Sequence, residues 1–416
     1  MKLTKEEISW IFYDCGNSAY SIIITTAIFP IYFTSMAAAS GASGAAATAW
    51  WNYGNAFATF IIVLLSPILG TIADYKSFKK RFFTFFALLG VAFTGFLALV
   101  PQTQWQVMMI FYVITVVGFA GSNIFYDAFL VDVSEDENMD RVSSSGFAFG
   151  YISSVFPFIL CIFLINFSGL DVLLMTKISF VITALWWGLF TLPMLKNVHQ
   201  KHYIPKEPNP VSNSFRRMFA TFKNIRKYRV IAIFLLAYFF YIDGVDTIIR
   251  NAAVFGEQIG LDTTGLMIAL LLTQVVAFPF ALLYGMLAKR FSAKNMIIFG
   301  IITYFLVCIM AFRMETIWDF AFLGFLIASA QGGIQALSRS YFAKIVPKNN
   351  ANEFFGFYNI LGKFAAIMGP ILIGTITLIT GDIRKAVLSL VILFGVGLVL
   401  ILRLPKNPER VEKNPV

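Results

Sequence analysis

Residues 70–81 read Gly70-Thr71-Ile72-Ala73-Asp74-Tyr75-Lys76-Ser77-Phe78-Lys79-Lys80-Arg81. This loop joins two long apolar segments. A glycine lies near the end of the first segment, an aspartate follows four residues later, and four cations come before the second. Cationic loops of this kind are typical of the cytoplasmic side of membrane proteins. A second copy, Gly285–Lys294, has Lys289 in place of the aspartate. The pair of loops indicates a membrane protein built from two related halves.

The rest of the chain is apolar enough for many membrane spans. It has 416 residues, 58% hydrophobic and 13% charged, with a mean hydropathy of +0.77. These values exclude an ordinary soluble domain. A spanning helix needs about 20 apolar residues, and the alternating pattern of barrel strands is absent. Twelve helices are predicted, at residues 8–35, 48–74, 82–100, 105–132, 145–167, 176–195, 230–255, 263–288, 295–312, 318–346, 353–379 and 386–403. The predicted fold class is an all-α membrane protein with two six-helix bundles related by pseudo-two-fold symmetry.

The longest polar stretch sets the predicted domain boundaries. Residues 1–195 form the N-terminal bundle, residues 196–229 a cytoplasmic linker, and residues 230–416 the C-terminal bundle with a short cytoplasmic tail. In the linker, His199 and His202 are expected to be solvated rather than metal-bound. An amphipathic helix on the membrane surface is predicted there, as a tether between bundles more than a regulatory element. Its apolar face comprises Phe215, Met218, Phe219, Phe222 and Ile225.

The net charge of +10 reflects topology rather than nucleic-acid binding. Of the 32 Lys and Arg residues, 25 lie in segments that are cytoplasmic if the amino terminus is inside, and four lie in the outside loops. By the positive-inside rule, both termini are predicted to be cytoplasmic.

Seven charged residues lie inside the predicted spans. Each costs roughly 2.5–3.5 kcal/mol at the centre of a bilayer, so such residues usually face a wet, protein-lined path. They fall on segments 1, 4, 7, 10 and 11, and the period of three segments predicts three-helix repeats around one central polar cavity. The seven are Asp14, Asp127, Asp243, Asp246, Arg250, Arg339 and Lys363.

Helical spacing groups polar residues on single faces. One face of segment 1 carries Asp14, Asn17, Ser18, Ser21 and Thr25. Segment 4 has Asn123 and Asp127, segment 7 has Asp243, Asp246 and Arg250, and segment 10 has Gln331, Gln335 and Arg339. These faces predict the substrate site.

Each predicted side chain has a role. Arg339 or Lys363 holds a carboxylate, while Asp243, Asp246 or Asp14 meets an ammonium group. Neutral hydrogen bonds come from Asn17, Gln331 and Gln335, and Arg250 completes the segment 7 face. Asp127 is predicted to carry the coupling proton, with pairing to Lys363 as the alternative.

Structural alternatives remain for several of these residues. Asp246 and Arg250 are also spaced for an ion pair within one helix. Arg339 is also placed to reach the membrane surface or to act as a latch, and Asp14 to act as a gate. The neighbouring aromatics, Tyr126, Tyr238, Tyr241 and Tyr358, are more often packing residues than ligand contacts.

The loop at 70–81 resembles the signature loop between helices 2 and 3 of the major facilitator superfamily. Ser77 and Phe78 depart from it, standing where a glycine and a cation are usual. The resemblance implies the major facilitator fold and a gating role for Gly70, Asp74, Lys79 and Arg81. Gly70 would allow close helix approach, and Asp74 would latch the cytoplasmic side.

Longer motifs resemble the vacuole effluxer, or autophagy-related, branch of this superfamily and its bacterial relatives. They are residues 13–20, 241–250, 331–340, 353–359 and 362–366. This resemblance adds Tyr358 and Asn359 as substrate-binding candidates and Glu353 as a gating candidate. Fungal members are associated with amino-acid export from the vacuole. Cys15-Gly16 and Asp246 depart from the usual pattern.

The predicted function is secondary active transport of a small amino-acid-like or zwitterionic solute by alternating access, with proton coupling. An exporter of an amphiphile and a transporter-like sensor without flux are the alternatives. No catalytic residue, metal ligand or cofactor is predicted, because the spans lack two-histidine, serine–histidine and nucleotide-loop patterns. The expected partners are a small-molecule substrate, the lipid bilayer and protons or another coupling ion. A monomer in a bacterial inner membrane is expected.

Overall fold

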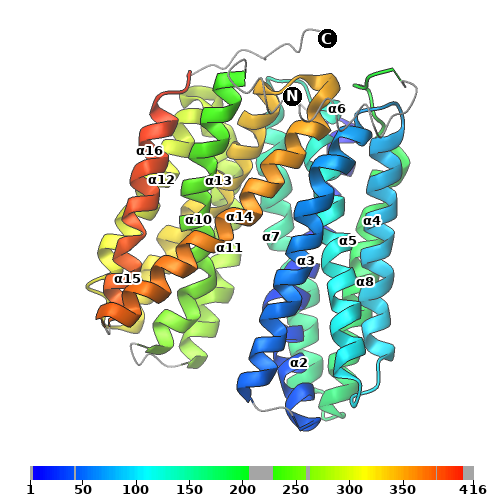
Figure 1. Ribbon diagram of the computed structural model, residues 1–416, viewed down its shortest axis with the longest axis vertical. Helices are drawn as coiled ribbons and strands as arrows, with labels where there is room; N and C mark the ends of the chain where they lie inside the picture. The colour runs from blue at the N-terminus through cyan, green and yellow to red at the C-terminus, as the bar shows by residue number, and fades with distance from the viewer. Residues whose placement is uncertain (1–2, 42–43, 206–227, 259–262, 381, 406–416) are drawn as a thin grey trace. The chain divides into compact units, whose positions relative to one another are not determined.

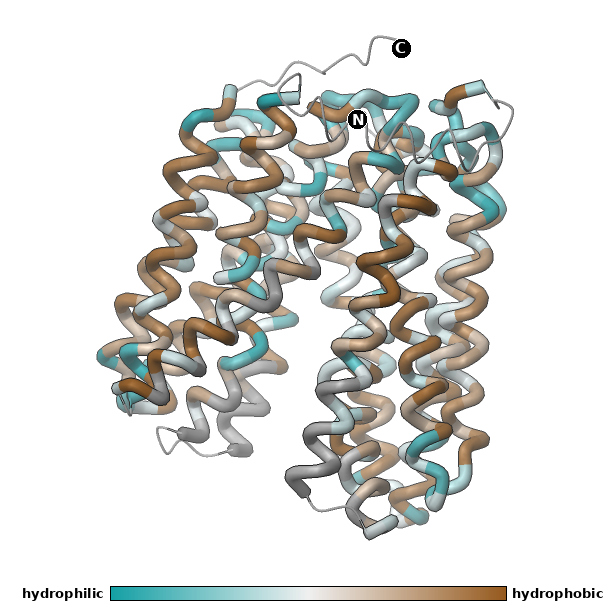
Figure 2. Tube along the Cα trace, in the orientation of Figure 1, coloured by the Kyte–Doolittle hydropathy of each residue, from teal (hydrophilic) through white to brown (hydrophobic). Residues whose placement is uncertain are grey.

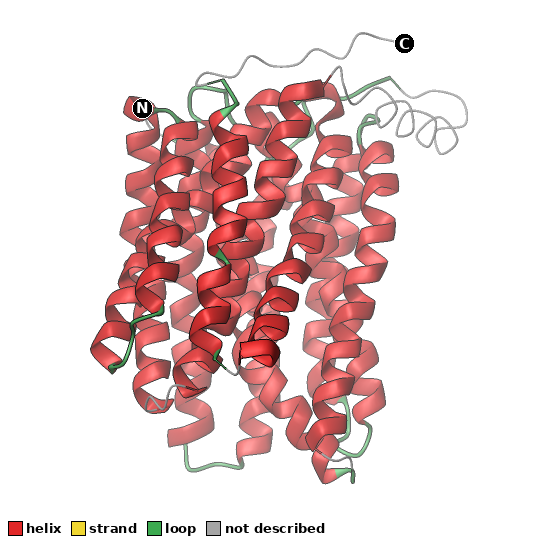
Figure 3. Ribbon diagram, turned by 60° about the vertical axis from the view of Figure 1, so that its left-hand side comes forward, coloured by secondary structure: helices red, strands yellow, loops and turns green. Residues whose placement is uncertain are grey.

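The computed structural model describes residues 3–41, 44–205, 228–258, 263–380 and 382–405. Within these ranges the regular structure is helical (Figure 3), and one isolated bridge joins Tyr75 to Ile204. The predicted amphipathic helix of the linker lies outside the described residues.

The helices of the first half follow the predicted spans. They are α1 (Lys5–Tyr20), the π-helix η1 (Ser21–Ala27), α2 (Ile28–Ala39), α3 (Gly44–Ala73), α4 (Phe78–Phe96), the 3₁₀-helix η2 (Leu97–Leu99), α5 (Trp105–Ala128), α6 (Leu130–Val133), α7 (Met139–Phe167) and α8 (Val172–Asn197). Thr4 and Glu7 form a capping box that starts α1, since each satisfies a backbone N–H that has no partner within the helix.

The second half repeats this organisation (Figure 1). Its elements are α10 (Arg229–Gln258), α11 (Thr263–Phe291), α12 (Ala293–Ala311), α13 (Ile317–Ile345), the 3₁₀-helix η4 (Lys348–Asn350), α14 (Ala351–Thr380), α15 (Ile383–Ser389) and α16 (Val391–Leu402). Thr316 and Asp319 form the capping box of α13.

Each of the twelve predicted spans coincides with a helix or a run of consecutive helices. Ten of these are long and apolar enough to cross a membrane when the described residues are considered. The 30-residue helices α3 and α14 lie at the other two predicted spans. Figure 2 shows apolar residues along the helix shafts and hydrophilic residues gathered near many helix ends. This pattern is expected where lipid surrounds the shafts and water the ends.

Packing divides the chain into two units. The first unit comprises residues 1–133 and 149–218, and the second comprises residues 134–148 and 219–416. The division differs from the predicted boundaries because helix α7 begins in the second unit and ends in the first.

Close helix crossings in each unit depend on glycine. In the first unit, α4 packs on α5 where Gly90 meets Gly118. In the second unit, α11 packs on α13 where Tyr284 covers Gly333. A missing Cβ lets the backbones approach, and helix association in membranes depends largely on such packing.

The two related loops share one backbone feature. Ser77 and Ser292 each follow the loop glycine by seven residues, and they have φ angles of 69° and 75°. A positive φ is costly for residues other than glycine. The usual glycine at position 77 in the signature loop therefore has a physical explanation, and the backbone repeat supports the predicted relation between the halves.

A substitution at Ser77 tests this strain. Ser77→Val is expected to lower the free energy of unfolding by about 1–3 kcal/mol, because a β-branched residue tolerates positive φ poorly. Ser77→Gly should keep wild-type stability or slightly exceed it, since the Ser77 side chain makes no capping bond. Thermal unfolding in detergent measures both variants. Equal stability of the valine variant and the wild type would contradict the strain argument.

Candidate functional site

In the first unit, a ladder of polar contacts joins α1 to α5. Trp10 Nε1 donates to Tyr126 O at 2.9 Å, and 2.7 Å contacts join Tyr13 to Ser122, Asn17 to Asn123 and Tyr20 to Thr115. From the first contact to the last, the α1 partner rises from residue 10 to residue 20 while the α5 partner falls from residue 126 to residue 115, so the two helices are antiparallel. The ladder sets the register of both polar faces.

This register places two acidic residues at one level. Asp14 precedes Asn17 by three residues, and Asp127 follows Asn123 by four, so both extend the Asn17–Asn123 pair in the same direction. Asp14 and Asn17 are buried, and Asp127 is half-buried. The electrostatic fields of both carboxyl groups reach Tyr13. The predicted grouping of polar residues on segments 1 and 4 therefore has a structural basis within this unit.

The polar face of segment 1 is shorter than its spacing predicts. Residues Ser21–Ala27 form a π-helix, in which Thr25 Oγ1 and Thr26 Oγ1 both donate to Ser21 O. A π-helix changes the rotation per residue. The α-helical spacing that placed Thr25 on the face of Asp14 therefore does not apply beyond Ser21.

The signature loop is held by a buried ion pair. Lys79 Nζ lies 2.6 Å from Asp132 Oδ2 and 3.2 Å from Ala128 O, and neither side chain of the ion pair is exposed. Of the other gating candidates here, Gly70 and Asp74 are buried and Arg81 is exposed. Asp132 was not predicted as a site residue. The ion pair fixes the loop to the end of α5 and α6.

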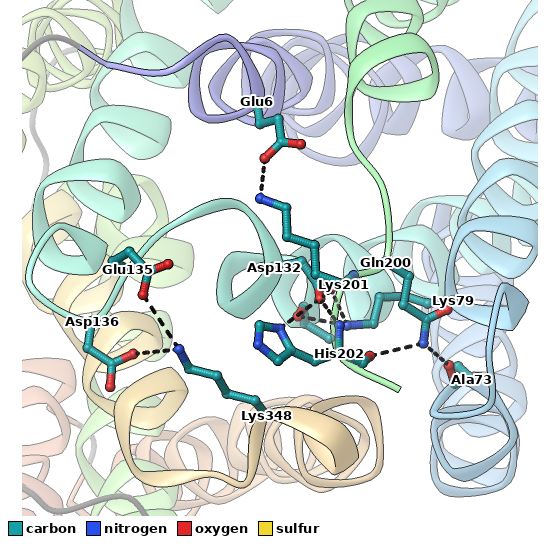
Figure 4. A network of polar contacts seen from close by, with 11 residues as sticks. Glu6, Ala73, Lys79, Asp132, Glu135, Asp136, Gln200, Lys201, His202 and Lys348 are labelled. Atoms are coloured by element: carbon teal, nitrogen blue, oxygen red, sulfur yellow. Dashed lines mark hydrogen bonds and ion pairs between the residues drawn. The ribbon is translucent and has the colours of Figure 1, made fainter. Parts of the chain in front are cut away.

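The start of the linker binds to the same carboxylate. The backbone N–H groups of Lys201 and His202 donate to Asp132 Oδ1 at 2.9 and 2.8 Å, and His202 Nδ1 lies 3.1 Å from that oxygen. Figure 4 shows Lys79, Lys201 and His202 converging on Asp132. His199 is exposed as expected, but the expectation of a solvated His202 is wrong because its ring is half-buried against Asp132.

Further contacts hold residues 198–204, here called the linker strap, against the first unit. Lys80 Nζ donates to Val198 O at 2.7 Å, and Gln200 Nε2 donates to Ala73 O at 3.1 Å. The Ile204 N–H donates to Asp74 O at 2.9 Å. The strap thus contacts the loop at 70–81, although its sequence carries no motif that predicts this.

In the second unit, the three charged residues of α10 differ in burial. Asp243 is fully buried, with an exposure of 0%, while Asp246 is half-buried and Arg250 is exposed. Arg250 Nη2 lies 4.0 Å from Asp246 Oδ2, one turn away. This is the ion-pair geometry of the structural alternative, and exposed pairs of this kind stabilise a helix only slightly.

Arg339 on α13 is held by the first turns of α7. Its Nε donates to Ser143 Oγ at 2.9 Å, its Nη2 donates to Ser143 O at 3.1 Å, and its guanidinium lies 4.5 Å from the centre of the Phe147 ring. Gln331 is buried and Gln335 half-buried on the same helix. The contacts of Arg339 favour the latch alternative over a carboxylate ligand.

A second set of contacts surrounds the start of α7 and the end of α13. Asp140 accepts from Lys344 Nζ at 2.6 Å and from Ser340 Oγ at 2.7 Å. Lys348 Nζ lies 3.8 Å from Glu135 Oε2 and 3.5 Å from Asp136 Oδ1 (Figure 4). Asp140 and Lys344 were not predicted as site residues. The acidic run at 134–140 was their only sequence signal.

The remaining candidates lie on α14. Glu353 and Tyr358 are buried, and the Tyr358 ring stacks on Tyr238 with centroids 4.2 Å apart. The Asn359 side chain donates to Phe355 O. The Lys363 side chain lies outside the described residues. Within the described chain, no cluster of His, Cys, Asp and Glu is arranged to hold a metal ion.

Comparisons with known proteins decide the family. The family model described as "Vacuole effluxer Atg22 like" matches residues 3–137 and 131–414. The chain belongs to the Atg22-like vacuole effluxer family. The predicted membership of the vacuole effluxer branch is therefore confirmed.

Two relatives illustrate the range of this Atg22-like family. The MFS-type transporter YxiO of Bacillus subtilis (strain 168) is 53% identical over 98% of this chain and 96% of its own length. Autophagy-related protein 22-1 of Neosartorya fischeri is 25% identical over 65% of this chain and 49% of its own. The chain thus spans about half the length of that fungal relative.

A solved structure confirms the fold of this Atg22-like protein. The structure of the MFS proton:xylose symporter XylE bound to 6-bromo-6-deoxy-D-glucose matches 98% of this chain and 97% of that one. The TM-score is 0.75 at 12% identity. The solved structure shows the major facilitator fold, and the match to the Atg22-like family and to the Bacillus transporter identifies the chain as a multi-pass integral membrane transporter rather than an enzyme.

Proposed function

We propose that this transporter moves a small amino-acid-like or zwitterionic solute by alternating access and couples this movement to protons. The observation that carries the proposal is the burial of Asp14 and Asn17 on α1, together with the buried carboxyl group of Asp243 on α10. Buried ionisable residues in membrane helices generally serve a substrate or ion path.

The first unit offers the acceptor side of a binding site. Asp14 and Asn17, adjacent to Asn123, would accept hydrogen bonds from a substrate ammonium group. Asp246 and the glutamines of α13, Gln331 and Gln335, would supply further polar contacts from the second unit. That the two faces meet in one cavity stays a prediction.

The cationic side of the site involves a choice between two residues. Arg339 is engaged by Ser143 and Phe147, so binding a substrate carboxylate would require it to leave them. Lys363 therefore stays the candidate for the carboxylate, with Tyr358 and Asn359 on the same helix. Arg339 is assigned to the gate, together with Gly70, Asp74, Lys79, Arg81 and Glu353.

The proposed setting is a bacterial inner membrane, with a monomer whose two termini are cytoplasmic. The relationship to a Bacillus protein supports this location, and the distribution of positive charge supports the orientation.

Reconstituted protein tests the proposed function. Proteoliposomes with an imposed pH gradient should accumulate at least one member of a panel of labelled amino acids and dipeptides, and a protonophore should abolish the accumulation. Counterflow without a gradient separates binding from flux. Flux of amphiphiles alone would contradict the proposed substrate class. Thermal stabilisation by a ligand without any flux would contradict transport and favour a sensor.

A further inference from the structure

The carboxyl group of Asp243 makes an unusual contact between two membrane helices. Its Oδ1 and Oδ2 lie 3.0 and 2.9 Å from the backbone nitrogen of Gly369 on α14, so both accept from one N–H group. Thr247 Oγ1, one turn along α10, donates to Oδ1 at 3.4 Å. A side-chain carboxyl thereby binds to the main chain of a neighbouring spanning helix.

The contact depends on a very close approach of α10 and α14, which cross obliquely (Figure 1). A Cβ at position 369 would lie 2.0 Å from Thr247 Oγ1. Only glycine therefore fits there without movement of the helices. Because Asp243 has no exposed surface, water is excluded from the contact as it stands.

Among the residues that the structure describes, the charged side chains whose electrostatic fields reach Asp243 are Asp246 and Arg250, on its own helix. The packed helix α16 carries no titratable residue. Titratable residues on the other elements packed against α10 are Glu353, Tyr358 and Lys363 on α14, Asp319, Arg339, Tyr341 and Lys344 on α13, Tyr284, Lys289 and Arg290 on α11, Lys294, Tyr304 and Cys308 on α12, and Arg384 and Lys385 on α15.

The arrangement differs between the two protonation states of Asp243. An ionised carboxylate forms a charge-assisted bond to the Gly369 N–H, and such bonds are roughly twice as strong as neutral ones. A proton on one oxygen converts that oxygen into a donor and removes the charge. The contact between α10 and α14 then weakens, and a buried neutral acid is much less costly in a membrane than a buried charge.

We propose that Asp243 is the proton carrier of this transporter and that its ionisation controls the contact between α10 and α14. The proton binds to a carboxyl oxygen of Asp243 from one side of the membrane and leaves to the other while the helices are separated, and the ionised carboxylate then restores the contact. The proposal rests on the proposed proton-coupled transport. It reassigns the proton from Asp127, which is only half-buried, to the carboxyl group that is fully buried and in contact with a second helix.

Hydrogen–deuterium exchange of the full chain in nanodiscs tests the helix contact without any substrate. After correction for intrinsic rates, protection of the peptide containing Gly369 should fall at least tenfold from about pH 8 to about pH 5. Asp243→Asn should abolish this dependence, and Asp243→Glu, which keeps an ionisable group, should retain part of it. Asp127→Asn is the matched control and should behave like the wild type.

Two outcomes would overturn the proposal. One is a flat pH profile in the wild type, which needs no variant to fold. The other is loss of the pH dependence in Asp127→Asn but not in Asp243→Asn.

Gradient-driven accumulation of the labelled amino-acid panel in proteoliposomes separates this inference from the proposed function. Asp243→Asn should lose gradient-driven accumulation at least tenfold, and Asp243→Glu, which keeps an ionisable group, should retain part of it. Gradient-driven accumulation that survives in Asp243→Asn would refute the inference and leave the proposed function intact. The wild type could instead show the expected pH dependence of hydrogen–deuterium exchange but accumulate no member of the panel. That result would refute the proposed function and leave the Asp243 contact as a pH-dependent switch.

Discussion

Asp132→Ala is expected to lower the free energy of unfolding by about 3–5 kcal/mol, the cost of leaving one member of a buried ion pair without its partner. Lys79 Nζ would lose its carboxylate partner in a site with no exposed side-chain surface. The backbone N–H groups of Lys201 and His202 would also lose their acceptor. Thermal and denaturant unfolding in a fixed detergent measures the change.

An exposed ion pair in the same region supplies the control. Lys201 pairs with Glu6, and their side chains are 49% and 30% exposed. Lys201→Ala should therefore change stability by less than about 1 kcal/mol. The double variant Lys79→Met/Asp132→Leu should recover part of the loss, because it removes both charges. Equal effects of Asp132→Ala and Lys201→Ala would contradict the assigned role of the buried pair.

Gly118→Ala is expected to have the second large effect, destabilising the first unit by about 3 kcal/mol. A Cβ at this position would lie 2.5 Å from both Cα and N of Gly90 and 2.9 Å from Phe86 O. These are backbone atoms, so no side chain is free to rotate away. Helices α4 and α5 would have to separate, with loss of packing along the crossing.

Gly395→Ala is the matched control, since nothing lies within 4 Å of a Cβ built there. Alanine is a better helix former than glycine, so this variant should equal or exceed wild-type stability. Expression and thermal unfolding, followed by size-exclusion chromatography, compare the two variants. The crossing argument fails if Gly118→Ala is as stable as Gly395→Ala.

The spans could be predicted from the sequence because a lipid bilayer leaves the backbone few choices. Every N–H and C=O must be paired internally, so a long apolar segment becomes a helix. The faces of α1 and α5 were also predictable, since helical spacing is a local property. The face of α1 ends early because the π-helix at Ser21–Ala27 changes the spacing. No composition signal marked that change.

Partners distant in sequence could not be predicted. Lys79 was a gating candidate through its motif, but its partner Asp132 lies 53 residues away and has no motif of its own. Similarly, the sequence placed Arg339 inside a predicted span. Its contact with Ser143, 196 residues away, could not be predicted because it depends on how α7 packs. Spacing placed Asp243, Asp246 and Arg250 on one face but gave no information about their graded burial.

The path of α7 has a consequence for the connectivity of the molecule. Because residues 134–148 belong to the second unit, the polypeptide passes between units after residue 133, after residue 148 and again between residues 205 and 228. A protease that cut the chain beyond the linker strap would break only one of three covalent connections. Two co-expressed fragments divided there would each retain a share of the second unit. Such fragments should reassemble into a functional carrier more readily than the halves of a protein whose chain passes between its units only once. The reason is that residues 134–148 of the first fragment pack within the unit formed by the second fragment.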